Sequence, residues 1–453
     1  MLKTLNAPKF FGRMPATIDY TTILPPEMWL TVIKLLAVSF PTFDSTTKRK
    51  RNKDSVLKSS PYIWTVSALS RFFRQLADPF RFQRVHLMVH AFQEPLLKLR
   101  RIERFLDLLE RRPEVKLWVR VLFIGQGSFS IEHQEVKKKY LAVEARVYKL
   151  VPELQNLQSL SCGVMSFSSS LFGGVLQLPR LETLEVNDFQ LKQGQPDPTP
   201  NWDAMNRHGG LLRTLTVKAI VSSSPHTTSA LIRLLQRESL TALVYWPHLF
   251  PEARGGVSLF WIILQHIPDY VFTCLRRLTI MIQPSDIEVQ RFVQFGTQCP
   301  NVTSLTLNWN FVDSPSQLLD RLRGSGLAEH HFPALQHFKG PLDFAPSFTR
   351  DRPVDTVISD PLAQHRRKHE GEDGVTVAFN VAALKPSVPL RVLHLIVMER
   401  SDADIEAVGQ HHSGLEEFTY EYIGVDDLCW SPGVEGAFGK LATLRMLTLE
   451  NTE

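Results

Sequence analysis

Cysteine and histidine are the side chains that could bind a metal ion or act as nucleophile and base, and neither is spaced for that chemistry. No two of the four cysteines lie within three residues of each other, whereas zinc sites and disulfide frameworks use closer spacing. We expect buried, reduced thiols. The paired histidines fall in a charged stretch or at an expected helix end, and we expect no metal there. These residues are Cys162, Cys274, Cys299, Cys429, His365, His369, His411 and His412.

Sequence motifs of nucleotide binding are missing as well. The segment Gly433–Lys440 approaches the pattern of a phosphate-binding loop, but its spacing is wrong and Leu441 stands where that loop needs Ser or Thr. Gly125 and Gly127 lack the third glycine of a dinucleotide-binding fingerprint, and this pair indicates a turn. We therefore expect no catalytic residue, no cofactor and no metal, and a protein that acts by binding.

Composition and charge indicate a soluble protein with two differently charged halves. The chain has 453 residues, of which 43% are hydrophobic and 21% charged. No run approaches the roughly 18 apolar residues of a membrane span, and the N-terminus has no apolar block typical of a secretory signal. Residues 1–150 carry 27 Lys and Arg against 13 Asp and Glu, and the remainder carries 24 against 33. We expect a cytoplasmic or nuclear location, no membrane, and different partners for the two halves.

Residues 22–87 predict two helices and a short strand. The first helix follows Leu24-Pro25-Pro26, since a first helical turn tolerates proline. The second covers Ile63–Ala77 and ends at Asp78-Pro79, and Phe82–Leu87 alternates like a strand. The predicted apolar faces consist of Met28, Val32, Leu35 and Leu36, with Trp29 and Ile33 beside them, and of Val66, Leu69, Phe73 and Leu76.

These two helices resemble an F-box. The resemblance rests on Leu24-Pro25-x-Glu27, on the apolar helix that follows, and on Val66–Ala77. It extends to Arg84–Leu87, a strand that commonly follows the module in fungal-type members. The resemblance implies docking onto the Skp adaptor of a cullin–RING (SCF) ubiquitin ligase. The adaptor-binding residues that it implies are Leu24, Pro25, Glu27, Val32, Ile33, Leu36, Val66, Leu69 and Leu76.

The insert between the two helices, about residues 41–60, is longer than the F-box pattern. It contains the basic run Lys48–Lys53, which fits a nuclear-import signal or a nucleic-acid patch, and equally a solvated loop. The helices also have an alternative interpretation. They could form a polar-faced cap that protects the first repeat of a solenoid.

Residues 91–152 predict a helix over Glu94–Arg112, a strand over Val115–Leu122 and a helix over Gln134–Leu150. Pro113 ends the first helix. Its arginines lie outside the apolar face, and no aromatic RNA-binding motif accompanies them, which favours a solvated surface. The order of elements is already that of the region that follows.

A recurrent leucine pattern occupies residues 153–453. Segments such as Leu181–Val186 and Leu275–Ile280 repeat the form L-x-x-L-x-L, in which the last two apolar residues point inward from a short strand. Most gaps between anchors are 24 to 35 residues and one is 55, in or slightly beyond the range of leucine-rich repeats. The anchors are Leu160, Leu184, Leu215, Leu243, Leu278, Leu305, Phe338, Leu393, Phe418 and Leu447.

Between the anchors the pattern becomes helical, and the longest gap predicts a loop over residues 341–389. A doubly wound α/β domain is the alternative, because it also alternates strands and helices. The shared L-x-x-L lead-in favours the repeat array. The predicted helices are Thr227–Gln236, Ser258–His266, Ser285–Thr297, Ser316–Leu322 and Asp402–His411.

The sequence therefore predicts an α/β protein, with a small helical F-box head followed by an irregular leucine-rich-repeat solenoid with a curved parallel sheet. Its parts are a flexible N-terminus (1–21), the F-box-like module (22–90), a transition (91–152) and the repeats (153–453). We expect a substrate adaptor of an SCF ligase that binds the Skp adaptor, and through it the cullin–RING ligase, and holds a protein substrate on its repeats. The alternatives are a leucine-rich scaffold without ligase contact and a nucleic-acid-associated protein that uses the basic half. A protein partner is favoured over a nucleic acid.

Overall fold

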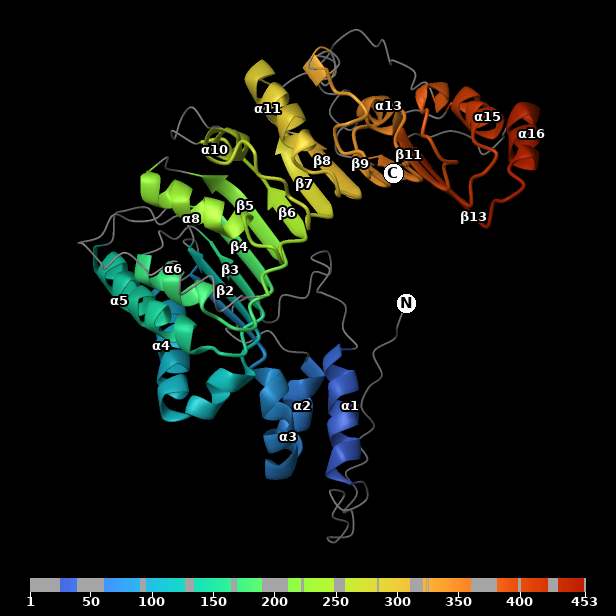
Figure 1. Cartoon of the computed structure of the whole chain (residues 1–453). Coiled ribbons are helices and arrows are strands. Elements are labelled where there is room, and N and C mark those ends of the chain that lie inside the picture. The colour runs from blue at the N-terminus through green and yellow to red at the C-terminus, as the bar shows by residue number, and fades with distance from the viewer. Residues whose placement is uncertain are drawn as a thin grey trace, which may run out of the picture.

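One parallel sheet runs through most of the chain in the computed structural model. Its 13 strands pair strictly in chain order, each with the next. Figure 1 shows the resulting arch, with the sheet on the inner side and helices on the outer side. The strands are β1 Arg84–Val89, β2 Val121–Gln126, β3 Ser159–Cys162, β4 Thr183–Phe189, β5 Thr214–Ile220, β6 Ala242–Tyr245, β7 Arg277–Ile282, β8 Ser304–Trp309, β9 His337–Gly340, β10 Thr356–Ser359, β11 Val392–Val397, β12 Glu417–Tyr422 and β13 Met446–Asn451. The structure describes residues 25–38, 61–89, 95–126, 134–163, 169–189, 211–220, 224–247, 257–282, 285–309, 321–322, 324, 326–359, 381–397, 401–422 and 431–451.

The predicted anchors form a single ladder across this sheet. Leu215 pairs with Leu184 on one side and with Leu243 on the other, and the same register continues in both directions. Because neighbouring strands bring these anchors side by side, they pack into one continuous core behind the sheet, except for Leu447 on β13, which is 41% exposed. The full ladder is Val85, Leu122, Leu160, Leu184, Leu215, Leu243, Leu278, Leu305, Phe338, Val357, Leu393, Phe418 and Leu447.

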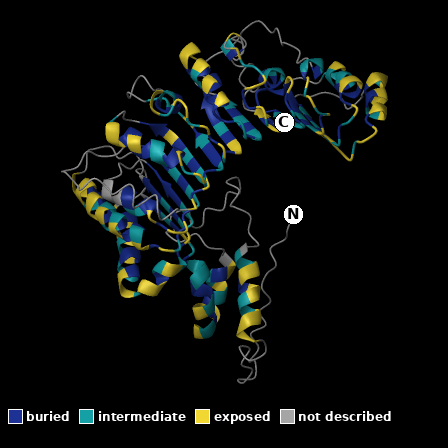
Figure 2. Cartoon of the chain, in the orientation of Figure 1, coloured by how far each residue is buried: buried dark blue, intermediate teal, exposed yellow. Residues whose placement is uncertain are grey.

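Helices form the outer layer of the arch, and Figure 2 shows their exposed faces directed away from the sheet. Several begin at a serine whose hydroxyl accepts a hydrogen bond from a backbone N–H three residues later, which satisfies a free donor of the first turn. Ser258, Ser285 and Ser401 act in this way. The α-helices of this layer are α4 Pro95–Arg111, α5 Gln134–Leu150, α6 Ser169–Leu176, α8 Pro225–Leu235, α10 Leu259–His266, α11 Asp286–Thr297, α13 Ala345–Thr349, α15 Asp402–His411 and α16 Pro432–Lys440, and the 3-10 turns are Pro113–Trp118, Val151–Glu153, Leu342–Phe344 and Val381–Ala383.

The strand order confirms the α/β fold class with a curved parallel sheet and excludes the doubly wound alternative. A doubly wound sheet reverses its strand order at a switch point, whereas this order runs from β1 to β13 without a reversal. Most predicted helices agree with the structure, and α15 has the predicted bounds. The helix predicted at Ser316–Leu322 lies outside the described residues except for 321–322.

The loop predicted over residues 341–389 is wrong for its described parts. Strand β10 lies in that interval and pairs with both β9 and β11, and α13 precedes it. The anchor of this repeat is Val357, and Val354 takes the place of the lead-in leucine; both side chains are buried. The rest of the interval, 360–380, lies outside the described residues.

The strand predicted over Val115–Leu122 is also wrong. Pro113–Trp118 forms a 3-10 helix, and the strand, β2, begins only at Val121. Val115 and Val119 are buried four residues apart while Leu117 between them is exposed, which fits a helical turn and not an alternating strand. Since β1 and β2 are full members of the sheet, the array starts before the predicted boundary at residue 153.

Among the described residues, three helices precede the array where two were predicted. They are α1 Pro26–Val38, α2 Pro61–Leu69 and α3 Arg71–Arg81. The predicted second helix breaks because the Ser70 side chain accepts a hydrogen bond from the backbone N–H of Phe73, 3.2 Å away, and so starts a new helix. The predicted end at Asp78-Pro79 is wrong as well, because α3 continues through Pro79 to Arg81.

In the part of the chain that the structure describes, none of the helices combines the length and the hydrophobicity that a membrane crossing requires.

Candidate functional site

Two of the three cysteines that the structure describes are buried thiols of low reactivity. Cys162 and Cys299 are buried, and burial raises the pKa of both thiols, so they stay protonated at neutral pH. His412 is buried too, and His411 is exposed. No group of three or more His, Cys, Asp or Glu among the described residues could hold a metal ion. Residues 365, 369 and 429 lie outside that part of the chain.

The three N-terminal helices have a small hydrophobic core of their own. The rings of Trp29 and Phe73 meet edge to face at its centre, with 4.9 Å between their centroids. This cluster is separate from the large core of the array. A helical cap would share its apolar face with the first repeat, so a separate core favours an independent module. The core residues are Ile33, Ile63, Phe73 and Ala77, with Trp29, Leu36, Ala37, Val66, Phe72, Leu76 and Phe80 packed around them.

The structure places the residues carried over from the F-box resemblance in two different environments. Ile33 is buried, and Leu36, Val66 and Leu76 pack against the small core, so these four side chains hold the module together. Pro25, Glu27, Val32 and Leu69 are exposed. The Pro25 carbonyl accepts hydrogen bonds from the backbone N–H groups of Met28 and Trp29 and so starts α1. Leu24 lies outside the described residues.

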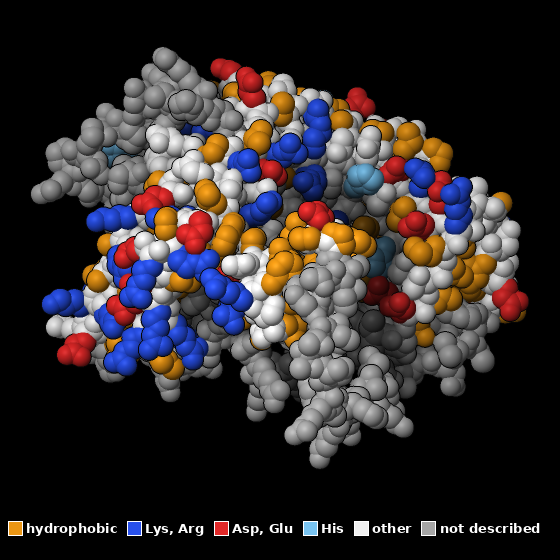
Figure 3. Space-filling model, turned by 90° about the horizontal axis from the view of Figure 1, so that it is seen from below, with side chains coloured by type: hydrophobic (Ala, Val, Ile, Leu, Met, Phe, Trp, Pro, Cys, Tyr) orange, Lys and Arg blue, Asp and Glu red, His pale blue; other side chains and the backbone are white. Residues whose placement is uncertain are grey.

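An apolar surface remains on the outside of this module. Met28, Val32 and Leu35 follow each other at helical spacing on α1 and are 52%, 38% and 62% exposed. Leu69, at the end of α2, is 67% exposed. We call Met28, Val32, Leu35 and Leu69 the docking face. Figure 3 shows hydrophobic side chains gathered over the N-terminal helices when the molecule is seen from below. An exposed apolar group of this kind is typical of a protein-binding site.

The apolar spacing alone did not identify the buried side of α1. It placed Met28, Val32, Leu35 and Leu36 on one apolar face, with Trp29 and Ile33 beside it. The structure buries Ile33 and half-buries Trp29 and Leu36, and it exposes Met28, Val32 and Leu35. Glu27, Thr31 and Lys34 form an exposed polar stripe on α1, and the face opposite this stripe, with Trp29, Ile33 and Leu36, packs inward as helical periodicity predicts. Met28 and Leu35 are thus functional candidates that the F-box resemblance missed.

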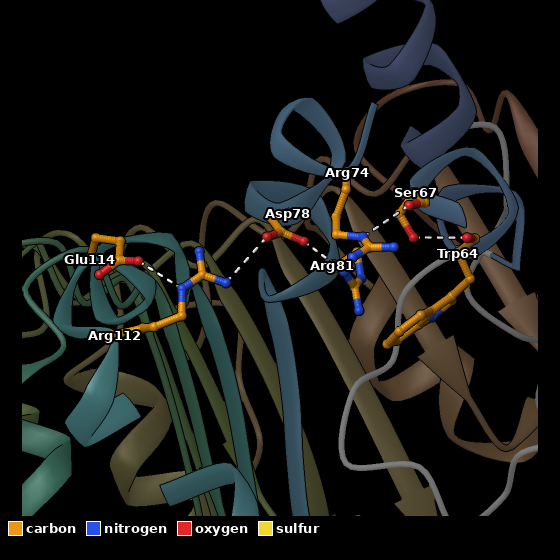
Figure 4. Close-up of polar contacts among 7 residues, drawn as sticks. All are labelled: Trp64, Ser67, Arg74, Asp78, Arg81, Arg112 and Glu114. Carbon is orange, nitrogen blue, oxygen red and sulfur yellow. Dashed lines mark hydrogen bonds and ion pairs between the residues drawn. The ribbon is translucent and has the colours of Figure 1, made fainter. Parts of the chain in front are cut away.

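A polar bridge joins the module to the array, as Figure 4 shows. The buried Asp78 carboxylate on α3 accepts from Arg81 at 2.6 Å and from Arg112, at the end of α4, at 3.4 Å. Arg112 also donates to Glu114 at 2.8 Å. Within the module, Arg74 donates to the Ser67 carbonyl and so ties α3 to α2. The bridge therefore restrains the angle between the helices and the first repeat.

Two further contacts tighten this junction. The guanidinium of Arg81 lies 4.2 Å from the ring centroid of Trp64, a cation–π contact within α2 and α3. Phe82, directly after α3, stacks on Phe105 and Trp118 in the core of the array. The pKa of Arg112 is raised, first by its hydrogen bond to Glu114 and then by Asp78. Only Phe82 and Gln83 separate α3 from β1, so the connection between the module and the array is short.

Replacing Asp78 by asparagine is expected to loosen the module by about 1–2 kcal/mol, because Arg81 and Arg112 lose their shared buried carboxylate. Hydrogen exchange should quicken in residues 61–81 and stay unchanged in the distant repeats. Asp107→Asn removes the carboxylate of a half-exposed ion pair with Arg146 and should change exchange far less. Equal exchange in the two variants would refute a restraining role for the bridge.

The acidic residues of α4 form ion pairs with basic residues of α5. Arg146 on α5 donates to both Asp107 and Glu110 on α4 at 2.8 Å, and Lys139 on α5 pairs with Glu103 at 3.2 Å. These pairs fasten the first two helices of the outer layer. In Figure 3 the Lys and Arg side chains gather on this side of the molecule.

The inner face of the sheet is the second candidate surface. On each strand the residues next to the anchor point away from the helices, because side chains alternate along a strand. The row directly after the anchors is polar over much of its length: Thr216, Thr279, Thr306, Lys339, His394 and Thr419. The hydroxyl and charged groups of this row face away from the core and can contact a partner. The anchors on the opposite side of each strand pack in the core.

Comparisons with known proteins add little to this description. Neither a family model nor a curated protein matches the chain. Solved structures that match include the TLR13 chain of a TLR13–ssRNA13 complex, with 12% identity and a TM-score of 0.36 over 76% of this chain and 51% of that chain. This chain therefore spans about half the length of the TLR13 chain. The likeness is too weak to carry an argument, and the repeat fold stands on the strand order and the anchor ladder.

Proposed function

We propose that this protein is a non-catalytic substrate-recognition subunit of an SCF ubiquitin ligase. The N-terminal helices bind a Skp-type adaptor, and through it the cullin–RING ligase, and the inner face of the sheet binds a protein substrate. The observation that carries the proposal is the docking face on a helical module with its own core. A protein–protein contact buries such apolar side chains at its centre, where truncation costs the most affinity.

The proposed mechanism is proximity. A substrate held on the inner face stays at a fixed distance from the ligase, because the polar bridge and Phe82 hold the module rigidly to the array. This raises the effective concentration of substrate lysines near the ubiquitin-charged enzyme, with no bond chemistry by the chain itself. The inner face suits this role because its side chains are not needed for the core.

Affinity purification of the full chain from cells, with the proteasome inhibited, tests this proposal. We expect the wild-type chain to recover the Skp-type adaptor and the cullin. The double variant Met28→Asp, Val32→Asp should recover neither, because two carboxylates in an apolar interface are expected to weaken binding by at least about a hundredfold.

The matched control is Leu141→Asp with Ile287→Asp, which adds two carboxylates at exposed apolar positions of α5 and α11. This control should recover the adaptor as the wild type does. If the wild-type chain recovers a protein substrate but no adaptor, the chain is a leucine-rich scaffold without ligase contact. If Met28→Asp, Val32→Asp keeps the adaptor, the docking face is assigned wrongly.

A further inference from the structure

The charges on the inner face are segregated along the array. Inner-face residues lie one residue before an anchor, or one or three after it, since these offsets share one side of a strand. On strands β5 to β9 the charged residues at these offsets are Lys218, Arg277 and Lys339, and these strands contain no Asp or Glu. On strands β10 to β13 they are Glu417, Glu421 and Glu450, and these strands contain no Lys or Arg. We call the two groups the basic zone and the acidic zone.

Ion pairs within the protein neutralise part of each zone. Lys218 pairs with Glu185 on the neighbouring strand, and the Glu421 carboxylate lies 2.7 Å from Nε2 of His394, from which it accepts a hydrogen bond when that nitrogen carries the proton. Among the described residues, Arg277 and Lys339 in the basic zone, and Glu417 and Glu450 in the acidic zone, form no ion pair. All four side chains are exposed. Four charges, two of each sign, therefore remain for a partner.

Charges at the starts of the strands do not cancel this division. Beside the basic zone, Arg276 donates to the carbonyls of Thr273 and Asn301, which leaves its positive charge in place. Beside the acidic zone, the cations and anions nearly balance. Arg391 forms a bidentate pair with Glu416, and Arg445 lies 4.0 Å from the same carboxylate. His337 lies 3.5 Å from Asp355 at the border.

We propose that the inner face binds one extended protein segment of segregated charge, with an acidic stretch on the basic zone and a basic stretch on the acidic zone. The proposal rests on the proposed function only in taking the inner face as the substrate-binding surface. Three strand spacings separate Lys339 from Glu417, and six separate Arg277 from Glu450. At about 4.8 Å a spacing these distances are about 14 and 29 Å, which an extended peptide covers with about four and nine residues.

A fluorescent peptide of four glutamates, four neutral residues and four lysines is the probe for this proposal, and its anisotropy with the full wild-type chain is the measurement. A peptide of the same composition with alternating charges is the comparison. The segregated peptide should bind on the order of tenfold tighter, and the difference should shrink as salt is raised, because exposed ion pairs are screened. Equal affinity for the two peptides overturns the proposal.

Two double variants locate the binding. Arg277→Glu with Lys339→Glu replaces the two unpaired cations of the basic zone by anions, so it should lose the preference for the segregated peptide and gain affinity for an all-lysine peptide. A misfolded chain would not show that gain. Glu417→Lys with Glu450→Lys should lose the same preference and gain affinity for an all-glutamate peptide. The matched control, Arg180→Glu with Lys440→Glu, changes two exposed cations on a helix-to-strand turn and on α16 and should bind as the wild type does.

Two results would contradict the proposal. The first is a preference for the segregated peptide that survives in both zone variants, since the peptide then binds elsewhere. The second is a dimer, seen in sedimentation, that the zone variants dissociate, since the face then belongs to a second copy of the chain. None of these measurements involves the docking face, so their results do not decide whether the N-terminal helices bind the adaptor.

Discussion

Replacing Arg352 by leucine is expected to destabilise the two repeats that contain β9 and β10 by about 3 kcal/mol. This guanidinium is only 2% exposed and donates to the backbone carbonyls of His331 and Ser347 at 2.9 Å, and also to that of Ala328. Burial lowers its pKa to about 10, so it remains charged at neutral pH. The carbonyl oxygens accept its hydrogen bonds in place of a carboxylate. Leucine leaves these buried acceptors without donors.

Hydrogen exchange of residues 326–359, with urea unfolding of the full chain, measures this effect. Arg350→Leu is the matched control, because that side chain is largely exposed and its only ion pair with a described residue is a 3.8 Å contact with Asp351. It should change stability by no more than about 0.5 kcal/mol. Arg352→Lys should fall between the two, since one ammonium group keeps the charge but cannot reach all the carbonyls. Equal protection in the two leucine variants would show that Arg352 does not hold this part of the array.

Replacing Leu243 by alanine is expected to cost about 3 kcal/mol, because it opens a cavity in the middle of the anchor ladder. Leu243 is fully buried on β6, between Leu215 and Leu278. Each repeat of a solenoid is stabilised by its neighbours, so exchange should increase in the repeats on either side of β6 first. The measurement is hydrogen exchange across residues 211–282 together with the midpoint of urea unfolding.

Leu211→Ala is the control for this change. It removes the same atoms from a leucine that is 46% exposed just before β5, and it should cost well under half as much. If both variants have the wild-type midpoint, the leucine at the anchor position is not a core residue and the ladder is wrong. If exchange increases only at the distant ends of the array, the coupling between neighbouring repeats is wrong.

The repeat fold could be predicted from the sequence because one chemical feature recurs at a nearly fixed interval. Each predicted anchor lies on a strand in the structure, in register with the next. Strand β10 was not predicted, because Val354 and Val357 occupy the two positions at which the repeat pattern has leucine. Valine fills the anchor position of a short strand as well as leucine does, but a search for leucine does not find it.

The helical module was harder to predict, and the reasons are local. The side chain of Ser70 caps a new helix, and the sequence around it reads equally well as one uninterrupted helix. On α1 the polar stripe of Glu27, Thr31 and Lys34 marks the exposed side, but the apolar spacing alone did not separate the buried Ile33 from the exposed Val32. The polar bridge could not be predicted, because Asp78 and Arg112 are 34 residues apart and meet only through the fold.

The charge division on the inner face also depends on the structure. The overall composition indicated an acidic back half, which would suit a basic partner. Only the strand register shows that Arg277 and Lys339 share the inner face with Glu417 and Glu450. The net charge of a region therefore does not describe the surface that its strands present.

Calorimetric titration of a purified Skp-type adaptor into the purified full chain tests the central claim most directly. Saturable binding at one adaptor per chain is predicted, with a negative change in heat capacity because apolar surface is buried. Leu141→Asp, Ile287→Asp should bind with the wild-type affinity, and Met28→Asp, Val32→Asp should show no saturable binding. A wild-type chain that shows no saturable binding, or equal affinities in the two double variants, would contradict the assignment of the N-terminal helices as the adaptor-binding module.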